Sequence, residues 1–533
     1  MPFKYSTNLT SRHQFALNSS FLLLFFCLAG SMVASSTPIM VGTNYSFTTK
    51  KKVKTPTTIA DCGELTKAIR EDNLEQVKEL LKSLDPNCTD PTPEYETIVQ
   101  ANGNYTWKRM HDRTPLVAAA RTGNMEIVRV LLDAGAKVNE YAREDAPPLT
   151  VAAGLGNTEF VKLFLQEGAN IKNNSNAHGS ALIAAARGGH NGLVKLLLAE
   201  GSEINAQTNG QGSALNAAAR KGRTETVALL LENGANIDAQ TNGQGSALNA
   251  AARHGHNEVI KLLAKKGANL NVHNNGQGSA LVAAARNGNT STVKLLADLG
   301  ANLDHQTNGQ GSALNAAARN GQLEMAKLLI ELGANLDVQT NGQGSALNAA
   351  ARNGNTSTVQ LLADLGANLD HQTNGQGSAL NAAARNGQLE MAKLLIELGA
   401  NLDVQTNGQG SALNAAARNG QIEMVRLLID KGANLDVQNN GQGSALNAAA
   451  RNGHHNIVEL LADSGADLDA QTNGQGSALN AAARNGHLGI VKLLVAKGAD
   501  VNVRNNGQGS ALAAASRNGH QHIVAYLLQE GGH

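Results

Sequence analysis

The sequence is poor in aromatic residues and carries no excess of charge of either sign. Phenylalanine, tryptophan and tyrosine make up 3% of its 533 residues, which suits a core built from alanine, leucine, isoleucine and valine. The formal net charge is +1, which gives no bulk electrostatic attraction to nucleic acid or to an anionic membrane. Nucleic acid is therefore not expected as a partner.

Residue sets that would indicate catalysis or metal binding are also missing. No group of Ser, His and Asp, or of Cys and His, stands apart from the background of the sequence. The pairs His254/His256 and His454/His455 fall at expected turns between helices, where a structural role outweighs metal binding. The sequence therefore predicts no enzyme, no cofactor and no metal site.

What the sequence does have is a strict internal repeat. A leucine recurs every 33 residues from Leu116 to Leu512, which makes thirteen copies of one unit. A period of this length indicates small supersecondary modules that bury their apolar faces by stacking on their neighbours. Such an array needs no single large core, so a chain of this length is not a difficulty.

One unit of the array shows how each module is expected to fold. Ser312 is a suitable N-cap for a first helix over Ala313 to Ala318. We expect Asn315 to reach back to the cap as a shorter version of a capping-box Glu or Gln. An apolar stripe from Met325 to Ile330 predicts a second helix. An extended hairpin arm follows, with its turn at Asn341-Gly342.

Helix, turn, helix and hairpin in 33 residues is the pattern of the ankyrin repeat. The stretch Arg113-Thr-Pro-Leu-Val-Ala-Ala-Ala-Arg-Thr-Gly-Asn-Met-Glu-Ile-Val-Arg-Val-Leu-Leu-Asp-Ala-Gly-Ala-Lys-Val-Asn139 resembles a near-consensus ankyrin unit. Later units have Ser-Ala-Leu-Asn where the family has Thr-Pro-Leu-His, a variant that is also similar to arrays in some bacterial envelope proteins. The resemblance implies an all-α repeat solenoid of stacked helix-turn-helix units with short β-hairpin loops, formed by thirteen repeats over residues 112–533.

The N-terminal residues 1–36 read as a secretory signal peptide. An apolar run from Phe21 to Ala29 follows a basic start, and Val33-Ala-Ser35 offers small residues for cleavage. An uncleaved anchor, or a lipoprotein acylated at Cys27, remains an alternative. The sequence predicts export to the periplasm or outside the cell, with no integral membrane segment after cleavage of the signal. Residues 37–60 are expected to be a flexible linker.

A divergent repeat and an insertion precede the regular array. Residues 61–90 are expected to form an N-terminal capping repeat, because their exposed positions are charged as a terminal unit requires. Residues 91–111 form an insertion loop with Tyr95, Tyr105 and the only tryptophan, Trp107. These aromatic residues are either anchors for a partner or a cover over the apolar end of the first repeat.

Two cysteines remain once the signal peptide is removed, Cys62 and Cys88. An even number of cysteines in an exported chain favours a disulfide. They flank two antiparallel helices of the capping repeat, which brings both to the same end of the unit. The alternative is a pair of buried thiols in a cytosolic protein.

The binding surface is predicted from the family. Ankyrin proteins usually hold partners at the hairpin tips and at the exposed end of the inner helix, positions that match Gln306, Asn308, Arg319 and Asn320 here. An arginine recurs at the helix end in successive units, which could form a ladder of guanidinium groups on the concave side. Alternatively, each arginine pairs with an aspartate such as Asp304 or Asp337, or with a helix C-terminal carbonyl. The candidate partner-binding residues are Tyr95, Tyr105, Trp107, Tyr141, Arg286, Arg319, Arg352, Arg385, Arg418 and Arg451.

The predicted function is a non-enzymatic scaffold that binds another protein through the concave face and the hairpin tips. One alternative is a binder of a repetitive anionic or glycan envelope polymer, using the arginine and Asn/Gln ladders. A second alternative is a regulator of an enzyme that docks through the N-terminal insertion. A uniform surface suits a periodic ligand, whereas a unique protein partner needs distinct side chains.

Overall fold

The computed structural model describes most of the chain from Asp61 to His533, in one compact unit that spans Ile59–His533. The predicted signal peptide and linker, residues 1–60, lie outside the described residues. No helix in the described part is long and apolar enough to cross a membrane. The described residues are 61–90, 95–99, 105–109, 114–142, 145–173, 179–208, 212–241, 245–272, 278–306, 311–339, 344–372, 377–405, 410–438, 443–471, 476–504 and 509–533.

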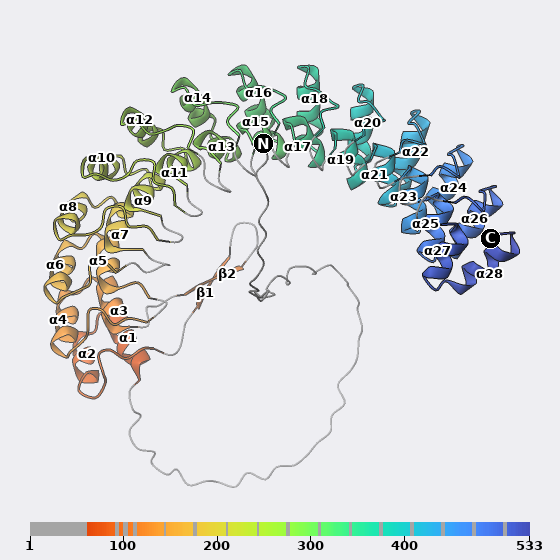
Figure 1. Cartoon of the computed structure of the whole chain (residues 1–533). Helices are drawn as coiled ribbons and strands as arrows, with labels where there is room; N and C mark the ends of the chain where they lie inside the picture. Colours follow the sequence, from red (N-terminus) through yellow and green to blue (C-terminus); the bar gives the residue numbers. More distant parts are fainter. Residues whose placement is uncertain are drawn as a thin grey trace, which may run out of the picture. The chain divides into compact units, whose positions relative to one another are not determined.

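The helices of this unit form two rows, and the inner row carries the odd numbers in Figure 1. From α7 onward these helices are runs of alanine around one leucine, as in Ala313–Arg319. The inner helices are α1 (Cys62–Arg70), α3 (Pro115–Thr122), α5 (Pro148–Leu155), α7 (Ala181–Gly188), α9 (Ala214–Arg220), α11 (Ala247–His254), α13 (Ala280–Arg286), α15 (Ala313–Arg319), α17 (Ala346–Arg352), α19 (Ala379–Asn386), α21 (Ala412–Arg418), α23 (Ala445–Asn452), α25 (Ala478–Arg484) and α27 (Ala511–Arg517).

The outer row carries the even numbers, and its helices turn an apolar stripe toward the inner row. In α16 this stripe is Met325, Ala326, Leu328 and Leu329. The outer helices are α2 (Leu74–Leu80), α4 (Met125–Asp133), α6 (Thr158–Gln166), α8 (Asn191–Ala199), α10 (Thr224–Glu232), α12 (Asn257–Lys265), α14 (Thr290–Asp298), α16 (Leu323–Glu331), α18 (Thr356–Asp364), α20 (Leu389–Glu397), α22 (Ile422–Asp430), α24 (His455–Asp463), α26 (Leu488–Ala496) and α28 (Gln521–Gln529).

Side-chain size explains how the two rows pack. Each inner helix contacts its own outer helix and the inner helices of both neighbouring repeats, while contacts between successive outer helices are sparser. Alanine lets the inner helices approach closely, so the row of helix pairs bends with the inner helices on its concave side (Figure 1). The core is the continuous layer between the rows, where Leu314, Ala317 and Leu329 are buried. The predicted all-α solenoid of stacked helix pairs is confirmed.

The inner helices begin and end as expected. In α15, the hydroxyl oxygen of Ser312 accepts the backbone N–H of Asn315 at 3.3 Å. The chain leaves the helix through Gly321 at φ 66°, a left-handed conformation that favours glycine. Local sequence therefore sets both ends of the helix.

Asn315 reaches back to the cap as expected, but to the hydroxyl of Ser312 and not to its backbone N–H, and it also bonds the next repeat. Its Oδ1 accepts the hydroxyl of Ser312 at 2.6 Å, and its Nδ2 donates to the carbonyl of Gly344 in the next repeat at 2.7 Å. A buried carbonyl needs a donor, and this one lies within reach of the amide. The same bond to the next repeat is made by Asn216, Asn249, Asn348, Asn381, Asn414, Asn447 and Asn480.

A second set of hydrogen bonds joins the outer helices to the previous repeat. In many repeats, the residue before the outer helix donates to the carbonyl of the arginine in the last turn of the previous repeat's inner helix. Gln322 bonds the carbonyl of Arg286 at 3.0 Å, and Nε2 of His487 lies 3.1 Å from that of Arg451. His256, His454 and His520 occupy the same position. These histidines satisfy helix carbonyls that would otherwise lack a partner.

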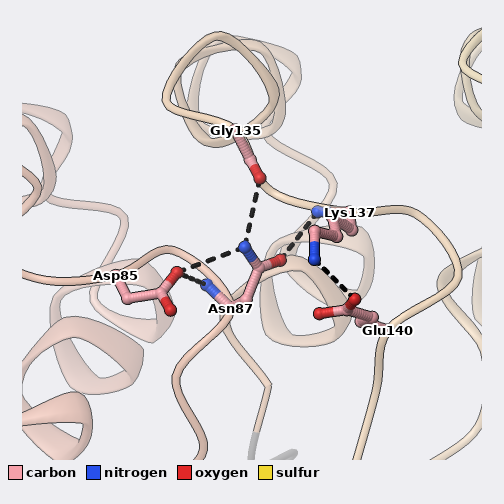
Figure 2. Close-up of polar contacts among 5 residues, drawn as sticks. All are labelled: Asp85, Asn87, Gly135, Lys137 and Glu140. Atoms are coloured by element: carbon pink, nitrogen blue, oxygen red, sulfur yellow. Dashed lines mark hydrogen bonds and ion pairs between the residues drawn. The ribbon is translucent and has the colours of Figure 1, made fainter.

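The capping repeat joins the array with bonds of the same kind as the other repeats use. Asn87 donates to the carbonyl of Gly135 at 3.1 Å and accepts the backbone N–H of Lys137 at 2.8 Å (Figure 2). Asn139 makes the equivalent pair with Gly168 and Asn170, at 2.9 and 2.8 Å. Residues 61–90 thus stack as a repeat although an insertion follows them.

The insertion contains a feature that the sequence interpretation missed. Strands β1 (Tyr95–Val99) and β2 (Tyr105–Arg109) pair antiparallel, with Tyr95 opposite Arg109 and Val99 opposite Tyr105. The described residues of the insertion, 95–99 and 105–109, therefore form strands. In the regular repeats, the expected turn at Asn341-Gly342 lies outside the described residues, and isolated bridges such as Thr208 with Gly212 mark the base of a hairpin arm.

Candidate functional site

The most regular surface feature is a row of arginines at the end of the inner helices. Each arginine lies in the last turn of its helix, where a cation interacts favourably with the helix dipole, and its side chain is partly exposed. We call these residues the arginine row: Arg187, Arg220, Arg253, Arg286, Arg319, Arg352, Arg385, Arg418, Arg451 and Arg484. It includes every arginine that the sequence offered as a partner-binding residue.

Neighbouring arginines of the row are close enough to affect one another. Burial lowers the pKa of Arg319, and the charges of Arg352 and Arg286 lower it further. The same two causes lower the pKa of Arg253 and of Arg451. An arginine remains protonated in spite of such shifts because its ordinary pKa exceeds about 12. The row is therefore a line of like charges, which an acidic ligand would stabilise.

The aspartates that the sequence offered as arginine partners hold the backbone of the next repeat. A carboxylate oxygen of Asp304 accepts the N–H of Asn335 at 2.9 Å, and one of Asp337 accepts that of Asn368 at 3.0 Å. The helix C-terminal carbonyl of Arg319 accepts from the side chain of Asn355 at 3.0 Å. These groups act in stacking the repeats.

The other predicted surface residues lie beside the row or apart from it. Gln306 and Asn320 are exposed, and Asn308 falls outside the described residues. Tyr141 is half-buried, and its hydroxyl accepts a hydrogen bond from Asn173 at 2.7 Å. It therefore links the hairpin arms of two successive repeats.

The aromatic residues of the insertion lie on both strands of its hairpin. Tyr95 is on β1, while Tyr105 and Trp107 are on β2. Trp107 pairs with Thr97 across the two strands. The pairing places Trp107, near the end of the insertion, beside a residue ten positions earlier in the chain.

The two cysteines of the capping repeat lie together at one end of it. A disulfide joins Cys62, the first residue of α1, to Cys88, with 5.8 Å between their Cα atoms. Next to it, the hydroxyl of Thr66 donates to the carboxylate of Asp90 at 3.2 Å. Both contacts tie the start of α1 to the segment that follows α2.

The side chains that could bind a metal ion are spread along the described part of the chain. Among those residues, no group of three or more His, Cys, Asp or Glu side chains is placed to hold a metal ion. The rings of His254 and His256 lie 6.1 Å apart and stack. Burial and the nearby Arg253 lower the pKa of His254.

A family model described as ankyrin repeats, in three copies, matches this chain seven times. The matched segments together run without a gap from residue 65 to residue 533: 65–175, 149–241, 182–274, 248–341, 314–406, 380–472 and 468–533. No curated protein matches the chain.

Proposed function

The chain belongs to the ankyrin-repeat family, and we propose that it is a non-enzymatic scaffold that binds an acidic partner protein on its concave face and hairpin tips. Ankyrin repeats are in general protein–protein interaction modules, which supports a binding role. The arginine row supports the choice of an acidic partner, because guanidinium groups form strong bidentate hydrogen bonds with carboxylates.

The stacking of the repeats would make such a surface rigid. The side chains of Asn348 and Asn381 are buried and bonded to the next repeat. Arginines held at fixed intervals need little ordering when a partner binds, which favours affinity. Several weak ion pairs that form together on one partner also bind more tightly than each would alone.

A second candidate is a repetitive anionic polymer, such as an envelope glycan. The observation that favours it is the uniformity of the row. Residues 278–343 and 344–409 differ only at Val282/Asn348 and Lys294/Gln360. A periodic ligand would find the same site in each repeat, whereas a folded protein would contact only part of the row.

The experiment that separates the two candidates combines a pull-down with a deletion. The chain is used as bait, and the recovered material is analysed for both proteins and glycans. Deleting residues 344–409 removes two whole repeats and leaves the remaining units in phase. Affinity that falls in proportion to the repeats removed favours the polymer. Recovery of a neutral or basic protein, with affinity independent of salt, would contradict both.

We also propose that the chain is exported to the periplasm or secreted. The disulfide between Cys62 and Cys88 supports this, since disulfides persist in oxidising compartments. The apolar run before the linker supports it as well. Mass spectrometry of the protein isolated from cells, under non-reducing conditions, tests the proposal. Two free thiols at these positions would contradict it.

A further inference from the structure

One repeat, near the N-terminal end of the array, has no arginine at the position that holds arginine in the other regular repeats. Gly154 occupies it between Arg121 and Arg187, each 33 residues away. Because glycine has no side chain, a hollow of about 370 Å³ opens on α5 between the two arginines. Its lining includes Val151, Gly154 and Leu155. The volume lies in the range of about 300–1,000 Å³ that is common for ligand pockets.

The same repeat departs from the others at the next residue. Leu155 is 53% exposed, whereas other repeats carry polar residues or glycine at this position: Thr122, Gly188, Lys221, His254, Asn287 and Asn320. Contact between an apolar side chain and water is unfavourable, so covering Leu155 with an apolar group would be favourable. The repeat that lacks the arginine side chain thus also exposes the apolar side chain of Leu155 at the hollow.

The backbone does not require glycine at position 154. A Cβ there would lie 3.5 Å from the Cβ of Ala184, which is ordinary van der Waals contact. Within a helix, glycine is less favourable than alanine. Gly188 differs, because a Cβ there would clash with the ring of His190. What Gly154 provides is the hollow itself.

We propose that this hollow binds an acidic peptide segment of the partner that carries one large apolar side chain. The apolar side chain lies against Leu155 and Val151, over Gly154. Carboxylates on either side of it pair with Arg121 and Arg187. The inference rests on the proposed function in that both place an acidic partner on the inner helix ends.

The charges around the hollow fit this occupant. Arg121 is exposed and Arg187 is half-buried. Burial and the charge of Arg220 lower the pKa of Arg187, so a carboxylate would stabilise its charged form. A purely apolar ligand would leave the two cations without a contribution to binding. A purely acidic ligand would leave Leu155 exposed.

The test uses a fluorescein-labelled pentapeptide, Asp-Glu-Phe-Glu-Asp, and measures its binding to the full chain by fluorescence anisotropy. Two matched peptides, Asp-Glu-Gly-Glu-Asp and Asn-Gln-Phe-Gln-Asn, lack the apolar side chain and the charges respectively. We expect the first peptide to bind at least tenfold more tightly than either of the others. Gly154→Arg should weaken its binding at least tenfold, and Leu155→Asn at least fivefold.

The matched control is Lys162→Gln, because Lys162 is an exposed residue of the outer helix α6 in the same repeat. It should leave peptide binding unchanged. Circular dichroism and melting temperature report whether Gly154→Arg is folded. Leu155→Asn changes an exposed residue, so it tests the hollow independently if Gly154→Arg does not fold. Equal binding of the three peptides, no binding of any, or binding unaffected by both substitutions would overturn the proposal.

The proposals for the hollow and for the arginine row can be tested separately. Arg319→Gln with Arg352→Gln changes the row and leaves the hollow intact, so the pentapeptide should bind this variant normally. If the variant also binds the recovered partner normally, the row is rejected and the hollow stands. If Gly154→Arg leaves the pentapeptide bound while the row variant loses the partner, the hollow is rejected.

Discussion

The buried asparagine that links one repeat to the next gives the sharpest stability prediction. Asn348 accepts the hydroxyl of Ser345 at 2.6 Å and donates to the carbonyl of Gly377 at 3.0 Å. Both side chains are at most 1% exposed. Asn348→Ala removes both of these bonds from buried partners, together with a longer bond from the Asn348 amide to the carbonyl of His371 at 3.3 Å. Each buried group that loses its partner costs about 1–3 kcal/mol, so the expected loss for the two groups is about 2–6 kcal/mol.

The measurement is hydrogen exchange read by mass spectrometry over α17 and α19. In a one-dimensional array, the lost free energy should appear as easier opening near the substitution. Val282→Ala is the matched control, because Val282 holds the same position in a nearly identical block. This control removes buried methyl groups and no hydrogen bond, and it should lower the free energy of unfolding by about 0.8 kcal/mol per carbon removed.

A double-mutant cycle tests the hydrogen-bond reasoning directly. Ser345→Ala combined with Asn348→Ala removes both members of the buried pair, so the combined loss should be less than the sum of the single losses by about 0.5 kcal/mol or more. Strictly additive losses, or an Asn348→Ala effect no larger than that of Val282→Ala, would refute the reasoning. Loss of protection spread evenly over residues 61–533 would refute the local character of the effect.

Three other predictions concern the core, the insertion and the disulfide. Leu347→Ala should cost about 2–5 kcal/mol, as for buried leucines generally, with exchange rising only around its own repeat. If the insertion holds a partner, Trp107→Ala should weaken binding by about 2 kcal/mol or more with helix content unchanged. A variant that melts at a lower temperature but binds normally would show instead that Trp107 covers the apolar end of the first repeat. Reducing the Cys62–Cys88 disulfide, which spans 26 residues, should destabilise the capping repeat by about 3–4 kcal/mol, read as faster exchange in α1 and α2.

The sequence predicted the parts of the fold that are set within one repeat. Ser312, the alanine run after it and Gly321 are local signals, and each acts in the structure as expected. The 33-residue period predicted the stacking, because units of this size bury their apolar faces only against one another. The fold could therefore be predicted almost completely.

Contacts between repeats were harder to predict. The partner of Asn315 is a carbonyl 29 residues away, and no pattern within a single unit indicates that distance. The hairpin in the insertion did have a signal. Two runs rich in β-branched and aromatic residues flank Asn102-Gly103, which is a strong hairpin signal, although the segment lies outside the 33-residue repeat.

The candidate site was predicted in part. The recurrence of arginine in the sequence indicated the row, but its half-burial and mutual repulsion depend on how the helices stack. The hollow could not be predicted from the recurring residues, because it depends on Gly154, which breaks the pattern of the repeats. The sequence signal for it is the single glycine at a position that holds arginine in the neighbouring repeats.

The most direct test of the central claim is the affinity of the recovered partner for a chain with the middle of the arginine row neutralised. Arg319→Gln, Arg352→Gln, Arg385→Gln and Arg418→Gln are combined, and the control is Lys327→Gln with Lys393→Gln, which removes two half-exposed cations from outer helices. Isothermal titration at two salt concentrations gives the dissociation constants. The account predicts at least a tenfold loss of affinity, about 1.4 kcal/mol, and a weaker salt dependence for the row variant alone. Equal affinity of the row variant, the control and the unaltered chain would contradict it.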